Sequence, residues 1–428
     1  MKTLQRVERH IIKPYNKNYN SLLLLTNKTK NLYNYVNYLL RQDFITKKPQ
    51  IKEYDLSKKL ASEKQFDYKE LPSQTAQQTI KLLYKDWKSF FKCLKSYQKD
   101  KNKFTSNPKL PKYKRKGEKG HHIAIFTNQQ AKIKQYKNFN KIVFPKSVNI
   151  KSIITKIDTN ISSLKQVRII SKATCFIVEI VYETNQLAIN YVKNSFLSCD
   201  LGLNNFVTTI DTQSKQPLII NGKGIKSINQ YYNKKKAYLQ AIAKKSNNRF
   251  ITKQLLKLLN FRENKLNDFL HKASNFLVKY CVKHSIETLI IGKNKEWKKE
   301  INLGAKNNQS FTSIPYENFI SKLAYKCETY GINFVLTEEN YTSKCDHLAN
   351  EKMKHQEKYL GKRIKRGLFK SSTNKILNAD VNGAIGIARK VFHNAVQTLV
   401  DSGTAFVPIK INSLLGRLKI YKRFLYKF

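Results

Sequence analysis

The sequence predicts a multidomain α+β protein, and three observations predict it. The chain has 428 residues, more than one ordinary core needs, so we expect about two to four structural units. The hydrophobic period is helical over residues 20–100 and alternating over residues 122–182. From residue 195 onward, apolar strands alternate with amphipathic helices. Hydrophobic residues make up 41% of the chain, which is enough to fill the cores of such units.

The first hundred residues are predicted to form one strand followed by helices. The strand covers residues 1–16 and ends in basic residues. A later helix is predicted to begin at Pro72 and Ser73. Lysines lie off its apolar stripe, so its exposed side is basic. The two apolar faces contain Leu32, Val36, Leu39 and Leu40 in the first helix, and Ala76, Ile80, Leu83, Trp87, Phe90 and Leu94 in the second.

A basic linker and a β-rich region follow. Residues 101–120 contain eight Lys or Arg together with Pro108 and Pro111, and we expect this linker to contact nucleic acid. The strands after it are predicted to form a small β-barrel or sheet that the N-terminal strand could join. The linker cations proposed to bind nucleic acid are Lys109, Lys112, Lys114 and Arg115. The predicted strands are 122–128, 141–145, 152–157 and a hairpin from Val167 to Tyr182.

The second half alternates strands and helices in a specific order. Three antiparallel strands come first, and parallel strands separated by helices follow, which is the ribonuclease H pattern. Residues 340–375 form a Lys-rich insertion before the last helix. The predicted strands are 196–200, 206–211, 218–220, 288–291 and 332–337, and the predicted helices are 226–246, 250–285, 316–330 and 379–393.

The charge of the chain points to a polyanionic partner. Its formal net charge is +52, from 81 Lys and Arg against 29 Asp and Glu. An AT-rich genome would inflate Lys, but it would raise Asp and Glu too, and these are scarce. We therefore expect binding to phosphate groups. No Gly-rich phosphate loop occurs in the sequence, which argues against an ATP-driven motor.

The sequence also indicates in which cellular compartment the protein is found. The first residues carry no apolar signal core, and the longest leucine run, Leu22 to Leu25, is far shorter than the roughly 20 residues of a membrane span. We expect a cytoplasmic protein with no membrane partner. Six cysteines are scattered without a Cys-x-x-Cys pair, so neither a disulfide framework nor a four-thiolate zinc site is visible.

Three acids are candidates for catalysis. Asp200 ends the first strand of the second half, Glu339 follows the strand 332–337, and Asp380 opens the last helix. The helical spacing of Asp380 with Ala384, Ile387 and Val391 puts its carboxylate on the stripe that faces the sheet. Buried carboxylates are costly unless cations neutralise them.

This pattern suits two-metal phosphodiester hydrolysis. Two divalent ions about 4 Å apart activate water and stabilise the leaving oxygen, and several carboxylates hold them. Mg²⁺ prefers oxygen ligands, so we expect two Mg²⁺ ions at Asp200, Glu339 and Asp380. The structural alternative is that Asp200 caps a turn, Asp380 caps a helix and Glu339 lies in a surface loop.

At these residues the sequence resembles the TnpB family, transposon-encoded RNA-guided DNA endonucleases related to the type V CRISPR effectors. The order and content of several blocks carry the resemblance. They are Cys-Asp-Leu-Gly-Leu-Asn-Asn-Phe-Val-Thr (199–208), Ile-Gly-Lys-Asn-Lys-Glu-Trp-Lys (291–298), Asn-Tyr-Thr-Ser-Lys-Cys (340–345), Tyr-Leu-Gly-Lys-Arg-Ile-Lys-Arg-Gly-Leu-Phe (359–369) and Asn-Ala-Asp-Val-Asn-Gly-Ala (378–384). Pro-Lys-Leu-Pro-Lys-Tyr-Lys (108–114) is also similar.

The resemblance implies a domain plan and partners. The partners would be a guide RNA from the transposon end and a double-stranded DNA target, with one protein chain per RNA. The cations Lys362, Arg363, Lys365 and Arg366 would lie near the substrate strand. The implied domains are a wedge β-barrel from 1–18 and 106–194, a helical recognition lobe at 19–105, a RuvC-like nuclease at 195–339, an inserted target-nucleic-acid-binding module at 340–375, the last nuclease helix at 376–394 and a basic tail at 395–428.

Two departures from the family pattern affect the predicted site. Most members carry the middle acid where this chain has Gly292. Glu339 follows the neighbouring strand and could reach the same metals, with Glu338 in reserve, because adjacent side chains on an extended strand point in opposite directions. Only one of the two should therefore face the metals.

The second departure concerns the zinc ribbon, which the family builds from two Cys-x-x-Cys pairs. The first pair is replaced by Cys345-Asp-His-Leu348, and Ser371-Ser372 stands where the second would begin. Cys345, His347 and His355 could form an irregular site, but structural zinc needs four well-placed ligands. We expect the module to fold without zinc.

Four functions remain open from the sequence. The leading one is an RNA-guided DNA endonuclease, which reads a short flanking DNA motif and leaves sequence recognition to base pairing. Its main rival is a nuclease-deficient RNA-guided DNA-binding repressor, which Gly292 favours and the three acids disfavour. A DDE transposase normally ends its acid triad with a helical Glu, whereas Asp380 is an aspartate. A ribosomal or structural RNA binder explains the charge but not the acids.

Overall fold

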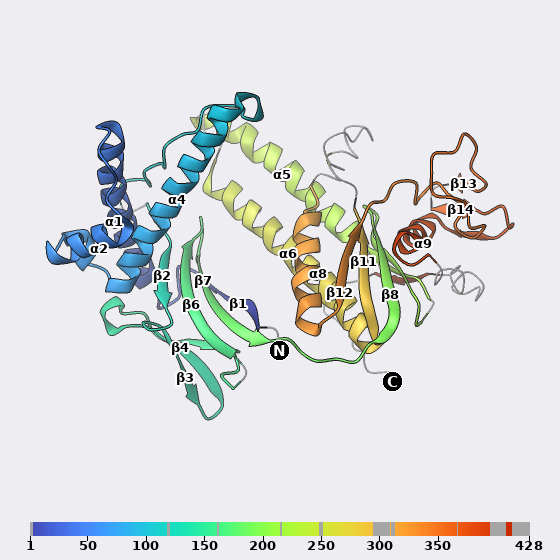
Figure 1. The fold of residues 1–428 in the computed structure, drawn as a ribbon, viewed down its shortest axis with the longest axis horizontal. Coiled ribbons are helices and arrows are strands. Elements are labelled where there is room, and N and C mark those ends of the chain that lie inside the picture. The colour runs from blue at the N-terminus through green and yellow to red at the C-terminus, as the bar shows by residue number, and fades with distance from the viewer. Residues whose placement is uncertain are drawn as a thin grey trace. The chain divides into compact units, whose positions relative to one another are not determined.

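The structure of this protein is a computed structural model, and it divides the chain into two compact units, Met1–Asn185 and Gln186–Phe428 (Figure 1). Each unit is described by itself. No helix among the described residues is both long and apolar enough to cross a membrane. The described residues are 3–117, 120–160, 162–214, 216–247, 251–293, 309, 313–365, 367–393 and 408–412.

The first unit contains the predicted helical region. Its two long helices, α1 and α4, pack against each other through the apolar faces that the sequence predicts, and Leu32, Val36 and Trp87 are fully buried there. Helix α4 begins at Ser73, as predicted, and the lysines off its stripe are exposed. The helices are α1 (Tyr19–Ile45), α2 (Glu53–Ser62), α3 (Phe66–Lys69), α4 (Ser73–Lys99) and a short 3-10 turn (Lys101–Lys103).

The strands of the first unit form two open sheets. The N-terminal strand β1 (Thr3–Ile12) does join the hairpin, pairing antiparallel with β7 along its whole length. In the described residues, however, the ladders do not close into the predicted barrel. Closure needs one continuous ladder, and the polar hairpin β3–β4 instead pairs only with β5. The sheets are β1-β7-β6-β2, with β2 at Ala124–Thr127, β6 at Ser162–Ser171 and β7 at Phe176–Asn185, and β3-β4-β5, at Lys132–Tyr136, Phe139–Val143 and Ile153–Thr155.

The second unit is built on a six-stranded sheet. Strands β8, β9 and β10 form an antiparallel meander, and β11 and β12 extend it on the other side of β8 as parallel strands. The sequence predicted all five strands but missed β16, which pairs parallel with β10. The sheet order is β12-β11-β8-β9-β10-β16, with β8 at Val192–Leu201, β9 at Asn205–Asp211, β10 at Leu218–Asn221, β11 at Ile286–Gly292, β12 at Asn333–Thr337 and β16 at Ile409–Ile411.

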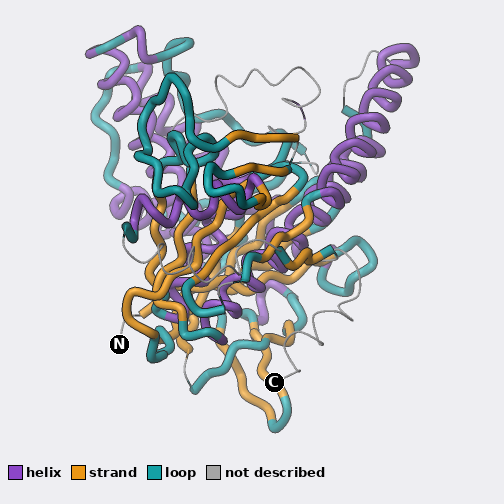
Figure 2. Tube along the Cα trace, turned by 90° about the vertical axis from the view of Figure 1, so that its right-hand side faces the viewer, coloured by secondary structure: helices purple, strands orange, loops and turns teal. Residues whose placement is uncertain are grey.

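Helices cover both faces of this sheet. Because side chains alternate along a strand, Leu197 and Cys199 of β8 face α6 and α8, whereas Phe196 faces α9. Figure 2 distinguishes the strands, in orange, from the helices, in purple. The helices of this unit are α5 (Lys223–Asn247), α6 (Lys253–Lys283), α8 (Tyr316–Tyr330) and α9 (Ala379–Val391).

The predicted insertion is a small module of loops around a three-stranded antiparallel sheet. Its strands are β13 (Lys362–Lys365), β14 (Leu368–Lys370) and β15 (Ile376–Asn378), and the last leads directly into α9. Leu348, Phe369 and Leu377 pack into the same core as the inner residues of α9. The module is thus anchored to the face of the large sheet that α9 covers.

Candidate active site

Asp200 lies at the end of β8 on the face covered by α9. Two residues earlier on that face, the Ser198 hydroxyl donates to the Ala384 carbonyl oxygen at 2.8 Å, which brings α9 against the strand. A Cβ atom at Gly383 would be 2.8 Å from Asp200 Oδ2, so glycine is what lets the helix come this close. Burial raises the pKa of Asp200 well above its usual range, and the nearby carboxylates of Glu339 and Asp380 raise it further.

Asp380 is the second residue of α9. The Asn378 side chain caps this helix by accepting from the backbone N–H groups of Asp380 and Val381. Asn205 Nδ2 donates to Asp380 Oδ2 at 2.7 Å, and a guanidinium nitrogen of Arg363 is 3.9 Å from Oδ1. The carboxylate is therefore held by the first residue of β9 on one side and approached by a module cation on the other.

Glu339 follows β12 by two residues, and its side chain reaches back over the neighbouring strand. Gly292 at the end of β11 pairs with Thr337 at the end of β12. A Cβ atom at Gly292 would be 2.6 Å from both Cγ and Oε1 of Glu339. The glutamate thus fills the space beside Gly292, the position where the family pattern places its middle acid. Burial raises the pKa of Glu339 to about 7, and Lys390 opposes this.

Glu338 points elsewhere. Its side chain is exposed, and Oε2 accepts from Asn340 Nδ2 at 3.4 Å. By contrast Glu339 is partly buried and raises the pKa of Asp200. Of the leading candidate Glu339 and the reserve candidate Glu338, Glu339 is therefore the one whose charge acts on Asp200.

Glu339 and Asp380 therefore both act on Asp200 through their charges. The buried hydroxyl of Tyr316 has a raised pKa because of burial and of Asp200 and Glu339, and it donates to the Gly202 carbonyl oxygen at 2.8 Å. No three His, Cys, Asp or Glu side chains within the described part of the chain are arranged to hold a metal ion. The donor chemistry nevertheless fits Mg²⁺, because all three groups are carboxylates and a cation would offset the cost of burying them together.

A carboxylate stands at the centre of the module, where the family pattern has zinc. Asp346 is fully buried, and its Oδ2 accepts from Ser371 Oγ at 2.8 Å, from Ser372 N at 2.7 Å and from Ser372 Oγ at 3.0 Å. Its Oδ1 accepts from the backbone N–H groups of Leu348 and Ala349 at 3.2 and 3.3 Å. One anion thereby ties together the two segments that replace the Cys-x-x-Cys pairs.

The residues named as an irregular zinc set are engaged differently. The Cys345 thiol donates to the Lys352 carbonyl oxygen at 3.6 Å, and burial raises its pKa. Both ring nitrogens of His347 are in hydrogen bonds, with the Thr342 carbonyl oxygen and with Arg389. His355 is exposed. The roles of Asp346, His347 and Arg389 were not predicted from the sequence, although Asp346 and His347 lie inside the altered motif Cys345-Asp-His-Leu348.

The basic linker of the first unit is fixed by its backbone and exposes its cations. The Pro111 carbonyl oxygen accepts from Asn37 and Arg41 of α1. Asn34 of the same helix forms a reciprocal pair with the backbone of Lys114, whose ammonium lies 4.4 Å from the Tyr33 ring centroid. The exposed predicted cations are Lys109, Lys112 and Arg115.

The module cations lie on its first strand. Lys362, Arg363 and Lys365 are exposed on β13, and Arg363 is the one that approaches Asp380. Arg366 was also predicted to contact the substrate strand, and it lies outside the described residues. Of the described module cations, Arg363 therefore brings positive charge next to Asp380.

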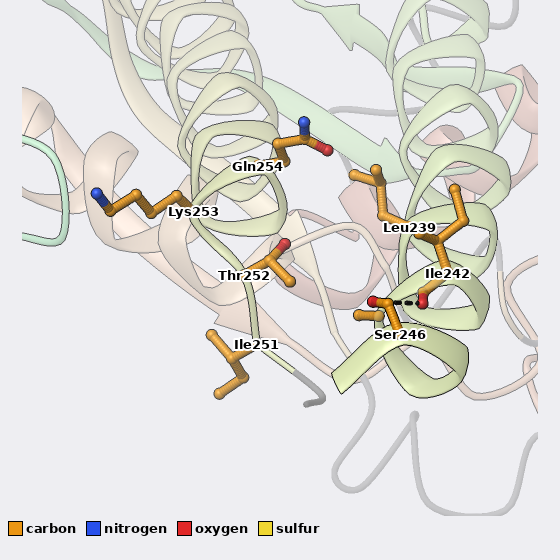
Figure 3. Close-up of a pocket in the computed structure, with 8 residues that line it drawn as sticks. Leu239, Ile242, Ser246, Ile251, Thr252, Lys253 and Gln254 are labelled. Carbon is orange, nitrogen blue, oxygen red and sulfur yellow. Dashed lines mark hydrogen bonds between the residues drawn. The ribbon is translucent and has the colours of Figure 1, made fainter. Parts of the chain in front are cut away.

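A separate pocket of about 400 Å³ lies between the end of α5 and the start of α6 (Figure 3). Leu239 and Ile242 point into it from α5, and Thr252 and Gln254 come from the other segment. The dashed bond in the figure is the Ser246 hydroxyl donating to the Ile242 carbonyl oxygen at 3.0 Å. Among the described residues that line this pocket there is no acid or histidine, so it is distinct from the site of the three acids.

Comparisons with known proteins agree with this architecture. Residues 179–298 match the OrfB_IS605 family model, described as a probable transposase, and residues 316–387 match the TNB domain of the Cas12f1-like proteins. A search of curated protein sequences finds no significant match. The solved structure of a Cas12f1–sgRNA–target DNA complex is similar at a TM-score of 0.51, with 14% identity over 86% of this chain and 82% of that chain.

A second similar structure is the mini-RNA-guided endonuclease CRISPR-Cas_phi3, with a TM-score of 0.44 and 10% identity over 92% of each chain. The likeness to Cas12f1 shows a shared mixed α/β fold. The resemblance to the TnpB family predicted from the sequence is confirmed, since the chain carries a probable-transposase region of the OrfB_IS605 kind followed by a TNB region like that of Cas12f1.

Proposed function

We propose that this protein is an RNA-guided DNA endonuclease with a RuvC-like site, in which Asp200, Glu339 and Asp380 hold two Mg²⁺ ions. The observation that carries the proposal is that the charges of Glu339 and Asp380 both act on the buried Asp200. The three acids come from the end of β8, the loop after β12 and the start of α9, and burial and like charge raise the pKa of Asp200. Acids gathered at this cost are typical of a functional site.

The protein groups have separable tasks in this proposal. Asn205 orients the Asp380 carboxylate, and Gly383 and Gly292 leave room for the Asp200 and Glu339 side chains. Bound Mg²⁺ would supply Lewis-acid activation of water and stabilise the leaving oxygen of the phosphodiester. Arg363 forms a loose ion pair with Asp380, 3.9 Å apart. This pair would separate when a metal ion binds the carboxylate or a phosphate binds the guanidinium.

Charge and similarity support nucleic-acid partners. The formal net charge of +52 calls for extensive phosphate contacts, and the Cas12f1 structure that resembles this chain holds sgRNA and target DNA. We infer that the linker cations contact a guide RNA or its heteroduplex, and that β13 contacts the substrate strand. The guide RNA would come from the transposon end, with one protein chain per RNA.

The direct test is incubation of the purified ribonucleoprotein with matched target DNA and Mg²⁺. RNA that co-purifies with the protein is sequenced first, so that the target can be matched to its guide. We expect Mg²⁺-dependent cutting of the matched DNA and none of an unmatched DNA. Co-purification of only random cellular RNA fragments, with no cutting, would support a generic RNA binder instead.

One observation favours a second function, a nuclease-deficient RNA-guided repressor. Gly292 stands where the family pattern places its middle acid, and a glycine offers no side-chain ligand. In that case the ribonucleoprotein would bind matched DNA with Mg²⁺ present and leave it intact. Binding without cutting under all divalent metals would therefore favour the repressor.

A further inference from the structure

A short chain of hydrogen bonds joins the inserted module to Glu339. Thr342 donates to the Glu339 carbonyl oxygen twice, from its backbone N–H at 3.2 Å and from its hydroxyl at 2.8 Å. The Thr342 carbonyl oxygen is 2.7 Å from His347 Nε2. His347 Nδ1 is 2.9 Å from a guanidinium nitrogen of Arg389, on α9. The backbone of the glutamate is therefore held from α9 through two intermediates.

The partners fix the state of the imidazole. Arginine can only donate, so Nδ1 of His347 must accept, and a neutral imidazole then carries its proton on Nε2. That proton is donated to the Thr342 carbonyl oxygen. The ring is 2% exposed, which leaves no route for water to replace either partner. Arg389 therefore donates a hydrogen bond to His347, and His347 donates one to the Thr342 carbonyl oxygen.

Arg389 is itself anchored in the module. The same guanidinium nitrogen that reaches His347 also donates to the Glu351 carbonyl oxygen at 3.0 Å, and the other bonds the Asn350 side chain. Asn382, two turns earlier on α9, donates to the Cys345 carbonyl oxygen at 2.9 Å. The segment that follows Glu339 is thus fastened to α9 at several points.

A glycine makes this contact possible. A Cβ atom at Gly386 would be 2.3 Å from His347 Nε2 and 2.9 Å from Thr342 Cβ. Gly383, three residues earlier, allows the same helix to approach Asp200. Helix α9 therefore contributes Asp380 itself. It also packs closely against Asp200 at Gly383 and against the segment after Glu339 at Gly386.

We propose that His347 and Arg389 are positioning residues that hold Glu339 in register with the two aspartates, so that the target-binding module and the acidic site are mechanically one unit. This inference rests on the proposed nuclease function. Neither residue touches metal or DNA in this proposal. Each acts through Thr342 on the backbone of Glu339, as partners of metal ligands do in other sites.

The test uses the full-length ribonucleoprotein and four variants. His347→Ala removes both bonds, His347→Gln keeps one donor and one acceptor, and Gly386→Ala displaces the ring without removing it. Asp346→Asn is the matched control, because Asp346 is equally buried in the same module but bonds Ser371 and Ser372 rather than Thr342. For each variant we would measure the dissociation constant for matched DNA, the single-turnover cutting rate at saturating DNA and the Mg²⁺ concentration for half-maximal rate.

The positioning role predicts a specific pattern. His347→Ala and Gly386→Ala should lower the cutting rate by at least about tenfold and raise the Mg²⁺ requirement, with DNA affinity unchanged. His347→Gln should recover part of the rate. Asp346→Asn should lower the melting temperature while the folded fraction cuts at the normal rate and normal Mg²⁺ requirement.

Two other outcomes would overturn the inference. They differ in whether the proposed nuclease function survives. If the His347 variants only lower the melting temperature, as is expected of Asp346→Asn, and keep a normal cutting rate and Mg²⁺ requirement, the residues are merely structural, while the proposed nuclease stands. If the unaltered ribonucleoprotein binds matched DNA but does not cut it with any divalent metal, the proposed function fails and the positioning role fails with it.

Discussion

Asp200 and Glu339 reach the same site by different structural means. Asp200 ends a ten-residue strand in the middle of the six-stranded sheet, with paired neighbours on both sides. Glu339 lies in a loop beyond the edge strand β12, and its backbone is held by Thr342. A position inside a sheet is fixed by many ladder bonds, whereas a loop position depends on a few. The glutamate should therefore be the acid that is easier to misplace.

The glycines beside the two acids sharpen this comparison. Gly383 faces Asp200 from α9, and Gly292 faces Glu339 from β11. In both cases a missing side chain makes room for a carboxylate from another element. At Gly292, however, the missing side chain is the family's usual middle acid. In our proposal the middle acid at Glu339 and the glycine at 292 compensate each other, because the glutamate side chain lies in the space beside Gly292.

The largest effect is expected from removing an acid of the sheet or of α9. Asp200→Ala or Asp380→Ala removes a metal ligand in our proposal, and the loss of about 4 kcal/mol of transition-state stabilisation corresponds to about a thousandfold lower cutting rate. Binding of guide RNA and matched DNA should remain. Cutting and electrophoretic binding assays on the same preparations would check this, and a variant that cuts normally would remove that aspartate from the site.

A smaller effect is expected from filling the space beside Glu339. In Gly292→Ala the new Cβ would lie 2.6 Å from Glu339 Oε1 and 2.4 Å from Ile387 Cδ1, so the glutamate must move. A displacement of about 1 Å at a reacting centre costs on the order of a hundredfold in rate. The double variant Gly292→Asp with Glu339→Ala should cut faster than Glu339→Ala alone, because it returns an acid to the vacated space. Equal rates for these two variants would contradict compensation.

The module should lose stability, rather than catalysis, when its central anion is removed. Asp346→Ala deletes the acceptor for Ser371, Ser372 and two backbone N–H groups, and we expect a loss of about 3 kcal/mol. Thermal unfolding monitored by limited proteolysis of residues 340–375 would measure it. Chelators should leave the unaltered module intact, and one zinc per chain in elemental analysis would refute the role of Asp346.

The smallest effect concerns pH. Burial lowers the pKa of His347 from 6.5 to about 4; the hydrogen bond to the Thr342 backbone and the charge of Asp346 oppose this, and Arg389 and Lys390 act in the same direction as burial. Below about pH 6.5, His347 is protonated in the unfolded chain, whereas in the folded module it stays neutral down to about pH 4. The free energy of unfolding should therefore fall as the pH drops below 6.5. The expected loss between pH 7 and pH 5.5 is about 1 kcal/mol. His347→Gln should flatten this dependence, and the exposed control His355→Gln should leave it unchanged.

The large elements could be predicted because periodic burial specifies them. The apolar stripe from Ala76 to Phe90 and the strands around Asp200 and Asp211 follow their patterns closely. Strand β16 and the module strands escaped prediction because each has only three or four residues, too few to show a period, and contains at least one polar residue. The equally short β10 was recognised by its continuous apolar run, Leu218–Ile220. The predicted barrel failed for a related reason, since alternation identifies strands but not whether their ladders close.

The acids were predictable and their supporting residues were not. Asp200 and Asp380 stand at the ends of recognisable elements, and Glu339 follows an apolar strand. Asp346 bonds to Ser371 across 25 residues, and His347 bonds to Arg389 across 42. Such bonds leave no periodic trace in one sequence, and the glycines at 292 and 386 become informative only when their neighbours in space are known.

The central claim is that Glu339, rather than its neighbour, is the middle acid. The most direct measurement compares cutting of matched DNA by Glu339→Gln and Glu338→Gln ribonucleoproteins at saturating DNA and Mg²⁺. Our account predicts that Glu339→Gln binds the DNA but does not cut it, and that Glu338→Gln cuts at the rate of the unaltered protein. Normal cutting by Glu339→Gln, or loss of cutting only in Glu338→Gln, would contradict it.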